Sequence, residues 1–446
     1  MKPTSLEIIE ILKKAGHQAY WAGGCVRDML LGTEPKDFDI VTSAKPEEIE
    51  QLLEHTIPIG KEFGVILAIK NGHHFEIATF RSDSGYSDGR RPDAVEFTSA
   101  KEDAFRRDFT INALFYDPDS DQVIDYVDGE VDMRDRLIRF IGNPEDRILE
   151  DHLRILRAVR FKNSLRFQYH PETYAAIKKH AQLVSKISPE RVRDELNKMI
   201  SGPNPGHAFQ ELFEIGALEL LIPELTRLKG LAQPLQYHKE GDVWDHAIRS
   251  LEALTNEEDD PNPLPAESPS LALTWATLMH DIGKYETFGA DDERIRYDEH
   301  ASAGARTATE ILKRLKFDKK TIQRVGWLIE HHMMVVPLFQ MSEGRRRHWF
   351  LQPGFEELLE VYRADAMGIE PIDLSLYNKL KKLYRHEIAK LKLMPKNLLS
   401  GTEVMQILKR EPGEEIGKIL ADIREKQLNG DLKNKKEAKV YLQKVY

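Results

Sequence analysis

Residues 22–42 read AGGCVRDMLLGTEPKDFDIVT: a pair of glycines and an Arg-Asp pair, followed by two alternating acids. The acids, Asp37 and Asp39, stand at the start of a strand-like run. On a strand, residues two apart point to the same face, so we expect both carboxylates on one side and Phe38 on the other. Because Mg²⁺ prefers one or two carboxylates together with substrate phosphates, the pattern predicts a magnesium site.

The glycines before the acids indicate a phosphate-binding turn. Gly23 and Gly24 permit close backbone approach, and the residues after them can begin a helix whose N–H groups face an anion. Arg27 adds a forked donor for a phosphate. Alone, a Gly-Gly pair is usually only a turn and a D-x-D pair is common in loops. Their order and spacing together are more specific.

The first part of the chain mixes strand-like and helical segments. Strands are expected at QAYWAG, FDIVT, GVILAIK, FEIATF and AVEF, and helices at 5–15, CVRDMLLG and PEEIEQLLEH. After Asn143-Pro144 the periodicity becomes mostly helical, and the Pro-rich acidic stretch 255–270 is expected to be a loop. We therefore predict an α/β head over 1–142, followed by helical segments over 143–228, 229–376 and 377–446.

Length and composition fit a multidomain globular protein. The chain has 446 residues, of which 31% are charged and 41% hydrophobic, so three or four domains are expected. No apolar run approaches the length of a transmembrane helix, so no membrane partner is expected. A single cysteine, Cys25, excludes an intrachain disulfide and fits a reducing, cytoplasmic setting.

Charge is distributed unevenly along the chain. The net charge is −10, yet residues 377–446 contain 17 Lys and Arg against 9 Asp and Glu, which leaves −18 for the rest. A basic tail on an acidic body is expected where the tail binds a polyanion. A solvated helical surface explains the charge equally well when charge is considered alone.

Further motifs follow the acids in a defined order. They are RRDFTINA at 106–113, DYVDG at 125–129, EDHLR at 150–154 and ISPERVRDE at 187–195. With the opening motif, this series resembles class II tRNA nucleotidyltransferases (CCA-adding enzymes) and bacterial poly(A) polymerases, which are of the DNA polymerase β type. The resemblance implies an α+β multidomain fold: a nucleotidyltransferase head with a mixed sheet, then an all-helical neck, body and tail.

The resemblance also implies roles for individual residues. Asp37 and Asp39 would hold Mg²⁺ and carry catalysis, and Glu76 is a candidate third carboxylate. The residues implied to bind the nucleotide are Gly23, Gly24, Arg27, Asp28, Arg107, Asp108, Asn112, Asp151, Arg154 and Arg157. Asp151 and Arg154 would share one helix face and read the Watson–Crick edge of CTP or ATP. An ordinary helix salt bridge is the simpler reading of that pair.

Two segments bear on which reaction of the family is expected. The polar stretch 80–97 occupies the place of a loop that the family needs for adding the terminal A. The segments 399–405 and 411–420 resemble the tRNA-binding tail of bacterial CCA-adding enzymes, whereas poly(A) polymerases are usually more basic there. We expect tRNA, ATP and CTP as partners. CCA addition, A addition alone, CC addition and poly(A) synthesis stay open, as does a monomer or a dimer.

A second constellation lies downstream. His246, His280, Asp281 and Asp365 follow the H…HD…D order and resemble HD-domain phosphohydrolases, which bind a divalent transition metal. Lys284 completes HDxGK, and His300 with His331-His332 falls where two-metal members place further ligands. The resemblance implies hydrolysis of 2′,3′-cyclic phosphates and phosphomonoesters in RNA-end repair. The chain could instead be primarily such a hydrolase, or, least favoured, a non-enzymatic RNA-binding scaffold.

Overall fold

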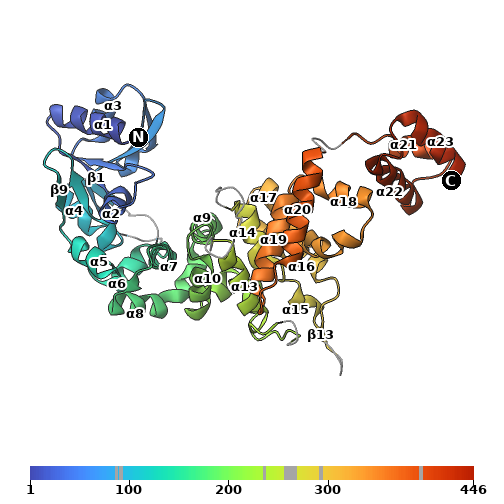
Figure 1. Cartoon of the computed structure of the whole chain (residues 1–446). Coiled ribbons are helices and arrows are strands. Elements are labelled where there is room, and N and C mark those ends of the chain that lie inside the picture. Colours follow the sequence, from blue (N-terminus) through green and yellow to red (C-terminus); the bar gives the residue numbers. More distant parts are fainter. Residues whose placement is uncertain (86–88, 90–93, 235–237, 256–268, 291–294, 391–394) are drawn as a thin grey trace. The chain divides into compact units, whose positions relative to one another are not determined.

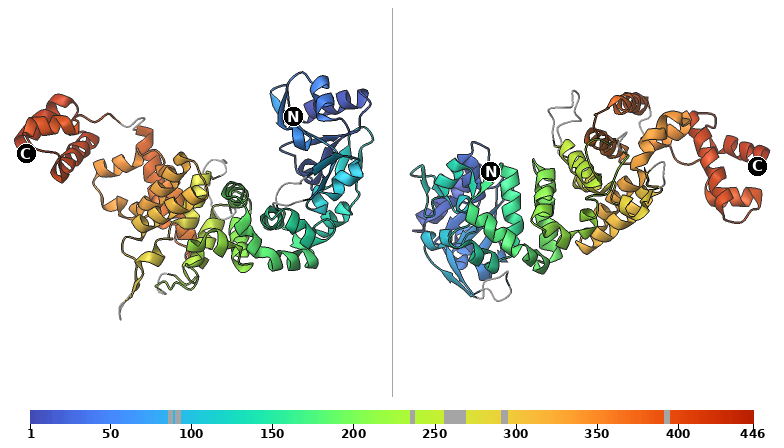
Figure 2. Two further views of the ribbon diagram at one scale, coloured as in Figure 1. Left: turned by 180° about the vertical axis from the view of Figure 1, so that it is seen from behind. Right: turned by 90° about the horizontal axis from the view of Figure 1, so that it is seen from below.

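The computed structural model separates the chain into two compact units, Met1–Pro223 and Glu224–Tyr446. The residues described are 1–446 except 86–88, 90–93, 235–237, 256–268, 291–294 and 391–394. The large sheet belongs to the first unit, and the second unit is almost entirely helical (Figures 1 and 2). The expected loop at 255–270 lies mostly outside the described residues. The boundaries expected at 142, 228 and 376 stay predictions.

A seven-stranded mixed sheet forms the core of the first unit. Its strands, in spatial order, are β3 (Thr56–Gly60), β4 (Val65–Lys70), β5 (His73–Thr79), β2 (Ile40–Thr42), β1 (Ala19–Ala22), β8 (Phe115–Asp117) and β9 (Gln122–Ile124). Neighbouring strands are antiparallel except β2 and β5, which are parallel. The predictions of β1, β2, β4 and β5 are confirmed. The sequence pattern misses β3, which is largely exposed, and β8 and β9, which are too short to show alternation.

Helices cover the sheet and continue after it. Those of the first unit are α1 (Lys2–Lys14), α2 (Gly24–Leu30), α3 (Pro46–Leu52), α4 (Ala100–Phe105), α5 (Gly129–Asp135), α6 (Pro144–Glu150), α7 (Leu153–Leu165), α8 (Pro171–His180), α9 (Pro189–Ile200), α10 (Pro205–Glu214) and α11 (Ala217–Leu221), with 3-10 turns at Lys61–Phe63 (η1), Thr110–Asn112 (η2) and Ala181–Lys186 (η3). The expected change to helix at Asn143-Pro144 is confirmed. The Asn143 side chain accepts a hydrogen bond from Glu145 N–H, and Pro144 begins α6.

The stretch 80–97, expected as a polar loop that ends in a strand at AVEF, is partly a hairpin, and the strand at AVEF is confirmed as β7. Its ends pair as antiparallel strands β6 (Arg81–Ser84) and β7 (Ala94–Phe97), and most of the residues between them lie outside the described part. Gly89 is described, and its carbonyl accepts a hydrogen bond from His152 N–H at 3.3 Å. A further small pair, β10 (Leu137–Ile138) and β11 (Gln168–Tyr169), is parallel.

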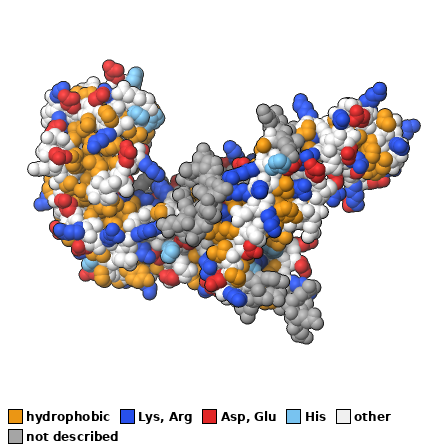
Figure 3. Space-filling model, in the orientation of Figure 1, with side chains coloured by type: hydrophobic (Ala, Val, Ile, Leu, Met, Phe, Trp, Pro, Cys, Tyr) orange, Lys and Arg blue, Asp and Glu red, His pale blue; other side chains and the backbone are white. Residues whose placement is uncertain are grey.

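The second unit consists of packed helices. They are α12 (Pro223–Thr226, at the boundary), α13 (Val243–Ala253), α14 (Leu271–Met279), α15 (Lys284–Thr287), α16 (His300–Arg314), α17 (Lys319–His331), η4 (His332–Gln340), α18 (Glu343–Phe350), α19 (Phe355–Gly368), α20 (Ser375–Lys390), α21 (Gly401–Leu408), α22 (Glu414–Asn429) and α23 (Lys435–Val445), with the short pair β12 (Gly289–Ala290) and β13 (Ile295–Arg296). Helices α21–α23 enclose their own small apolar core, which includes Val404, Ile419 and Leu442. Lys and Arg side chains are mixed with Asp and Glu side chains on the surface of these three helices (Figure 3).

Cys25 is buried and carries a free thiol. Among the helices that the structure describes, none is both long and apolar enough to cross a lipid bilayer.

Phe38 fixes the direction in which the two acids beside it point. Its ring packs on Trp21 of β1, with ring centroids 4.9 Å apart, and the Trp21 indole N–H donates to Ser5 Oγ of α1 at 3.0 Å. Phe38 keeps 4% of its surface exposed, whereas Asp37 and Asp39 are exposed. The alternation expected from the sequence is therefore present, since burial of the ring holds both acids on the opposite side.

We predict that Phe38→Ala lowers the free energy of unfolding of the first unit by about 3–5 kcal/mol, because a buried ring leaves a cavity. Equilibrium denaturation of the full chain, with hydrogen exchange at β1 and β2 amides, would measure the loss. Phe38→Leu, which refills most of the space, should cost less. Equal stability of Phe38→Ala and the unmodified chain would contradict this packing role.

Candidate functional site

A glycine turn connects β1 to α2. Gly23 has a φ of +70°, where residues with a Cβ are strained, and its N–H donates to the Leu114 carbonyl at 3.1 Å. A Cβ at Gly23 would lie 3.2 Å from Nη1 of Arg107. The position therefore favours glycine on two grounds, and the turn places the start of α2 beside a guanidinium group.

A chain of polar contacts leads from this turn into α7. Arg27 donates from Nη1 to Asn112 Oδ1 at 2.7 Å and from Nε and Nη2 to Asp28 Oδ1 at 3.0 and 2.7 Å. Asn112 donates to Asp108 Oδ1 at 3.2 Å, and Asp108 Oδ2 accepts from Arg157 Nε at 2.7 Å. Five residues expected at the nucleotide site are thus joined in one network.

The charge of Asp108 is held by neighbouring guanidinium groups. Burial alone would raise the pKa of Asp108, but Arg157 and Arg154 hold it below its ordinary value. The carboxylate therefore stays ionised and accepts hydrogen bonds from both Asn112 and Arg157, which fixes the two side chains relative to each other.

The acid pair lies directly beside the glycine turn. Ala22 N–H donates to the Asp39 carbonyl oxygen at 3.0 Å, which locks the end of β1 to the residue that precedes β2. The sequence places these segments on either side of α2, and the sheet brings them together. Asp37 and Asp39 therefore share one side of the chain with the turn next to them.

Glu76 approaches the same acids. Ile40 of β2 pairs with Ile77 of β5 in parallel register, so Asp39 and Glu76 each directly precede a paired residue. Partial burial and the charges of Glu76 and Asp37 raise the pKa of Asp39 to about 6, against an opposing effect of Arg107. Carboxylates that repel one another at the surface form an oxygen-rich site suited to a divalent cation such as Mg²⁺.

Arg106 and Arg107 are both anchored by Asp103, a residue that the sequence interpretation misses. Asp103 is fully buried on α4, and its two oxygens accept from Arg106 Nη2 at 2.6 Å and from Arg107 Nε at 3.0 Å. The Arg107 guanidinium also lies 5.0 Å from the ring centroid of Phe115. The available signal was helical spacing, since Asp103 precedes these arginines by three and four residues.

The expectation that Asp151 and Arg154 share a helix face is wrong. Helix α6 ends at Glu150, Asp151 is extended with a φ of −145°, and α7 begins at Leu153. Asp151 is held by Arg191 of α9 through two hydrogen bonds of 3.0 and 2.7 Å. Arg154 instead donates to Glu150 at 2.6 Å. The two residues remain neighbours in the chain, but each has a separate partner.

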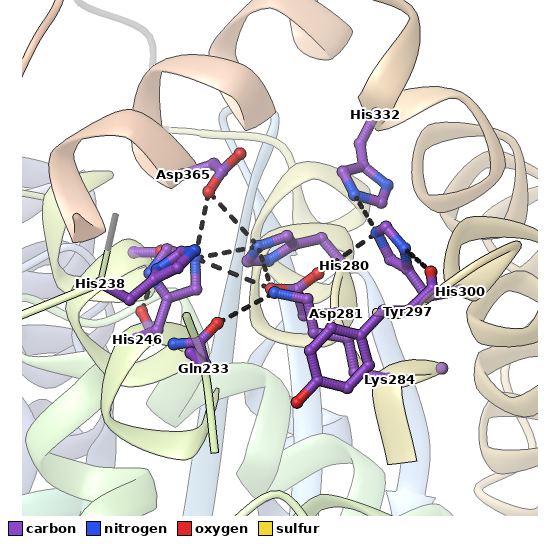
Figure 4. A network of polar contacts seen from close by, with 12 residues as sticks. Gln233, His238, His246, His280, Asp281, Lys284, Tyr297, His300, His332 and Asp365 are labelled. Carbon is purple, nitrogen blue, oxygen red and sulfur yellow. Dashed lines mark hydrogen bonds and ion pairs between the residues drawn. The ribbon is translucent and has the colours of Figure 1, made fainter. Parts of the chain in front are cut away.

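In the second unit, the four H…HD…D residues converge (Figure 4). Nε2 of His246 on α13 lies 3.3 Å from Nε2 of His280 and 3.0 Å from Oδ1 of Asp365 on α19. Oδ2 of Asp281 lies 3.3 Å from Nε2 of His280 and 3.8 Å from Nε2 of His246. We call this group the first metal position (His246, His280, Asp281 and Asp365).

The geometry of the first metal position fits a metal ion. Ligand atoms about 2.1 Å from one ion lie roughly 3.0–3.4 Å from one another in octahedral or tetrahedral shells, close to the separations observed. Imidazole and carboxylate donors together suit divalent transition metals. Burial lowers the pKa of His280, but Asp281 and Asp365 outweigh it and raise the pKa to about 10. Without a cation, protons would therefore neutralise this cluster, and metal binding would displace them.

Two buried partners of this cluster are not apparent from the sequence. Glu240 Oε1 lies 3.3 Å from Nδ1 of His246 and 2.7 Å from Nδ1 of His238. A carboxylate at Nδ1 orients an imidazole so that Nε2 can bind a metal. Lys284, nearly buried, lies 2.6 Å from Asp281 Oδ2 and donates to Gln233 at 3.0 Å. Neither Glu240 nor Gln233 belongs to a pattern that marks it as a partner.

Comparison with known proteins gives three family matches along the chain. Residues 19–139 match the family model described as "Poly A polymerase head domain". Residues 166–229 match "Probable RNA and SrmB- binding site of polymerase A", and residues 300–440 match "tRNA nucleotidyltransferase domain 2 putative". The fold of the first unit is thus that of a nucleotidyltransferase.

Full-length relatives define the family. The CCA-adding enzyme of Levilactobacillus brevis is 33% identical over 440 residues, which cover 97% of this chain and 95% of the relative. That of Bacillus velezensis is 31% identical over 442 residues with the same coverage. A crystal structure of the Bacillus stearothermophilus CCA-adding enzyme in complex with CTP has a TM-score of 0.72 and 26% identity, over 99% of this chain and 96% of that one. The chain belongs to the family of CCA-adding enzymes.

We predict that Asp39→Asn raises the melting temperature of the metal-free protein above pH 6. The pKa of Asp39 is about 6 in the folded protein and 3.8 ordinarily, so its protonation stabilises the fold. The stabilisation from this protonation is complete below about pH 3.8 and is lost as the pH rises through about 6. The difference in melting temperature between variant and unmodified chain should therefore shrink towards pH 4. A difference in melting temperature that does not change with pH would contradict repulsion between Asp39 and the neighbouring carboxylates.

Proposed function

We propose that this chain builds the CCA end of tRNA, or its terminal A, from CTP and ATP without a nucleic-acid template. Membership of the CCA-adding enzymes supports the reaction, and the relative from Bacillus stearothermophilus was solved with CTP. The observation that carries the residue assignment is the hydrogen bond from Ala22 N–H to the Asp39 carbonyl, 3.0 Å long. It joins a phosphate-facing turn to a carboxylate pair, the two parts that nucleotidyl transfer requires.

In this reaction the tRNA 3′ hydroxyl attacks the α-phosphate of the nucleotide and pyrophosphate leaves. Asp37 and Asp39, with Glu76 as third carboxylate, would hold a divalent cation, Mg²⁺, which supplies charge stabilisation at the reacting oxygens. Gly23 and Gly24 let backbone N–H groups approach the triphosphate. The nearby guanidinium groups bind phosphate oxygens by forked hydrogen bonds.

Arg27, Arg107 and the Asn112–Asp108–Arg157 contacts form the remaining wall of the nucleotide site. Asp28 holds Arg27 through two hydrogen bonds, so the guanidinium is oriented before the nucleotide arrives. We assign Asp108 a positioning role on the sugar side of the site, because its carboxylate accepts from Phe109 N–H and Asn112 at Oδ1 and from Arg157 at Oδ2, and so holds these groups in place.

Asp151 and Arg154 select the base in this proposal. Asp151 accepts one hydrogen bond from Leu153 N–H and two from Arg191, which leaves one of its roughly four lone-pair positions for an amino group of cytosine or adenine. Arg191 fixes the direction of that carboxylate. Arg154 donates from Nη1 to Glu150 and Arg147 and from Nη2 to the Arg106 carbonyl, which uses three of its five N–H donors and leaves two for a ring nitrogen or carbonyl.

The basic C-terminal segment supplies the tRNA contact. Residues 377–446 have an excess of eight positive charges, which suits sequence-independent binding of phosphates. Most of this excess lies in residues 377–400, which contain seven Lys and Arg against one acid, whereas residues 401–446 contain ten against eight. Helices α21–α23, which have their own apolar core, therefore add a folded surface of mixed charge.

Product lengths test the reaction. With tRNA lacking CCA, CA or only A, and with CTP and ATP supplied separately, a CCA-adding enzyme extends each substrate to the complete end and then stops. Asp39→Ala should lower incorporation by more than about 100-fold, because even outer partners of metal ligands contribute 10–100-fold, while tRNA binding persists. Glu54→Ala, which removes an exposed acid, is the matched control. Long A tails on unrelated RNA would point to a poly(A) polymerase, and retained incorporation by Asp39→Ala would refute the assignment.

The first metal position supports a second candidate function, phosphoester hydrolysis at RNA 3′ ends. Two imidazoles and two carboxylates, from α13, α19 and the turn after α14, converge there at separations typical of a ligand shell. A divalent transition metal held there would supply activated water. Lys284, 2.6 Å from Asp281, would balance negative charge beside a bound phosphate.

Hydrolysis can be tested separately from nucleotide addition. We predict metal-dependent cleavage of bis-p-nitrophenyl phosphate and of an RNA 2′,3′-cyclic phosphate, abolished by chelation and by Asp281→Ala. The same variant should still add nucleotides, since the carboxylates assigned to that reaction lie in the first unit. No metal-dependent turnover by the unmodified chain would exclude the hydrolase.

A further inference from the structure

The face of the sheet that carries the carboxylates continues past Glu76 as an apolar surface. Leu67 of β4 lies opposite Glu76 of β5, and Ile57 of β3 lies opposite Leu67. Residues directly opposite each other in antiparallel strands point to the same face, so these three side chains form one row. In the next row, Ile69 of β4 lies opposite His74 of β5. We call Ile57, Leu67 and Ile69 the apolar shelf.

The other face of the same strands is covered by a helix. Ile66 and Ile77, which point to that face, are fully buried. Through Ile40, Ile77 is in register with Trp21, whose indole N–H donates to a serine of α1. Helix α1 therefore lies on that face. The shelf side is more open, since Ile57 keeps 45% of its surface exposed and the other two shelf residues are half-buried.

The order of the strands places the carboxylates between the apolar shelf and the glycine turn. From the edge inward, the strands follow the order β3, β4, β5, β2 and β1. The shelf lies on β3 and β4, Glu76 on β5, Asp39 directly before β2, and the glycine turn directly after β1. Arg107 lies beside this turn, because a Cβ at Gly23 would be 3.2 Å from its Nη1. The groups assigned to the triphosphate and the apolar shelf therefore lie on opposite sides of the carboxylates.

We propose that the apolar shelf binds the 3′-terminal nucleotides of the RNA that is extended. In nucleotidyl transfer, the attacking 3′ oxygen and the departing pyrophosphate oxygen lie roughly in line, on opposite sides of the α-phosphorus. With the triphosphate on the side of the glycine turn, the 3′ hydroxyl approaches from the side of β5 and β4. The inference rests on the proposed nucleotide addition and names where its RNA substrate is held.

An apolar surface suits a substrate whose last base changes during the reaction. A chain that completes CCA must accept an RNA that lacks all three nucleotides, then one that ends in C, then one that ends in CC. A surface of hydrogen-bond donors and acceptors strongly rejects ends that lack matching partners, whereas apolar contacts discriminate weakly. The three side chains of the shelf offer only hydrocarbon, which packs on any base or ribose.

The edge of the sheet is poorly suited to pairing with another strand. β3 is the edge strand, and its Pro58 has no N–H to donate. The register between β3 and β4 is also irregular between Ile57 and Gly60. Proline and a bulge at an edge both hinder the addition of a strand from a second chain. A partner therefore contacts the face of the sheet rather than its edge.

Steady-state kinetics with a short acceptor-stem RNA tests the apolar shelf. Ile57→Asp should raise the KM for the RNA at least about tenfold, because like charges brought together at an interface are costly. The KM for CTP should stay unchanged. Ile57→Lys alters the same position but attracts phosphates, so it should not raise the KM for the RNA. Leu6 lies on α1 and keeps 37% of its surface exposed, so Leu6→Asp, with the same new charge, should behave like the unmodified chain.

Photo-crosslinking tests the same contact in the unmodified chain. An acceptor-stem RNA with 4-thiouridine next to its 3′-terminal C is bound to the full chain and irradiated. We expect mass spectrometry to find the RNA attached to peptides from β3 and β4, within residues 56–70. This result does not depend on the folding of any variant.

The outcomes separate this inference from the proposed function. Equal KM values for the RNA in Ile57→Asp and Leu6→Asp, or attachment only outside residues 56–70, would overturn the RNA contact and leave nucleotide addition intact. No incorporation by the unmodified chain would overturn the proposed function and this inference with it. A dimer that dissociates in Ile57→Asp, with an unchanged KM for the RNA, would assign the shelf to a second copy of the chain. If Ile57→Asp and Ile57→Lys raise the KM equally, the substitutions disturb the strand, and the crosslink decides.

Discussion

The arrangement of the first unit depends on one backbone hydrogen bond, from Ala22 N–H to the Asp39 carbonyl at 3.0 Å. It closes the pairing of β1 with β2 at the point where β1 ends in a glycine turn. On one side of this bond lie backbone groups that can face phosphate, and on the other lie the carboxylates. Phe38 and Trp21 beneath it keep the acids pointing outward, so apolar packing determines where the charged groups stand.

The parts of this site that were predictable from sequence are those with local causes. Two-residue alternation placed Asp37 and Asp39 on the side opposite Phe38, and glycine chemistry indicated the turn. The prediction that Asp151 shares a helix face with Arg154 failed because the Asp151 side chain accepts a hydrogen bond from Leu153 N–H at 3.0 Å. This local bond competes with the helix and separates α6 from α7. Asp103 and Glu240 were missed because their importance comes from partners that only the folded chain identifies. In the second unit, the order of four residues predicted a cluster, but not that Asp281 would divide its oxygens between two groups of histidines.

The two sites gather ligands of different chemistry. The first unit presents only carboxylate oxygens, which suit a hard cation that arrives with the nucleotide. The second presents imidazole nitrogens with their Nδ1 hydrogens already committed, which suit a transition metal held by the protein itself. A chain with both kinds of site can therefore select a hard cation at one and a transition metal at the other through the type of donor atom alone.

The contact between Gly283 and α16 has an evolutionary consequence. A Cβ at position 283 would collide with the backbone of His300 and Gly304 at the start of α16. Any larger residue there requires a shift of α16 or of the turn that contains His280 and Asp281. A substitution at a position that supplies no side chain to the cluster can therefore alter the spacing of the histidines and carboxylates within it.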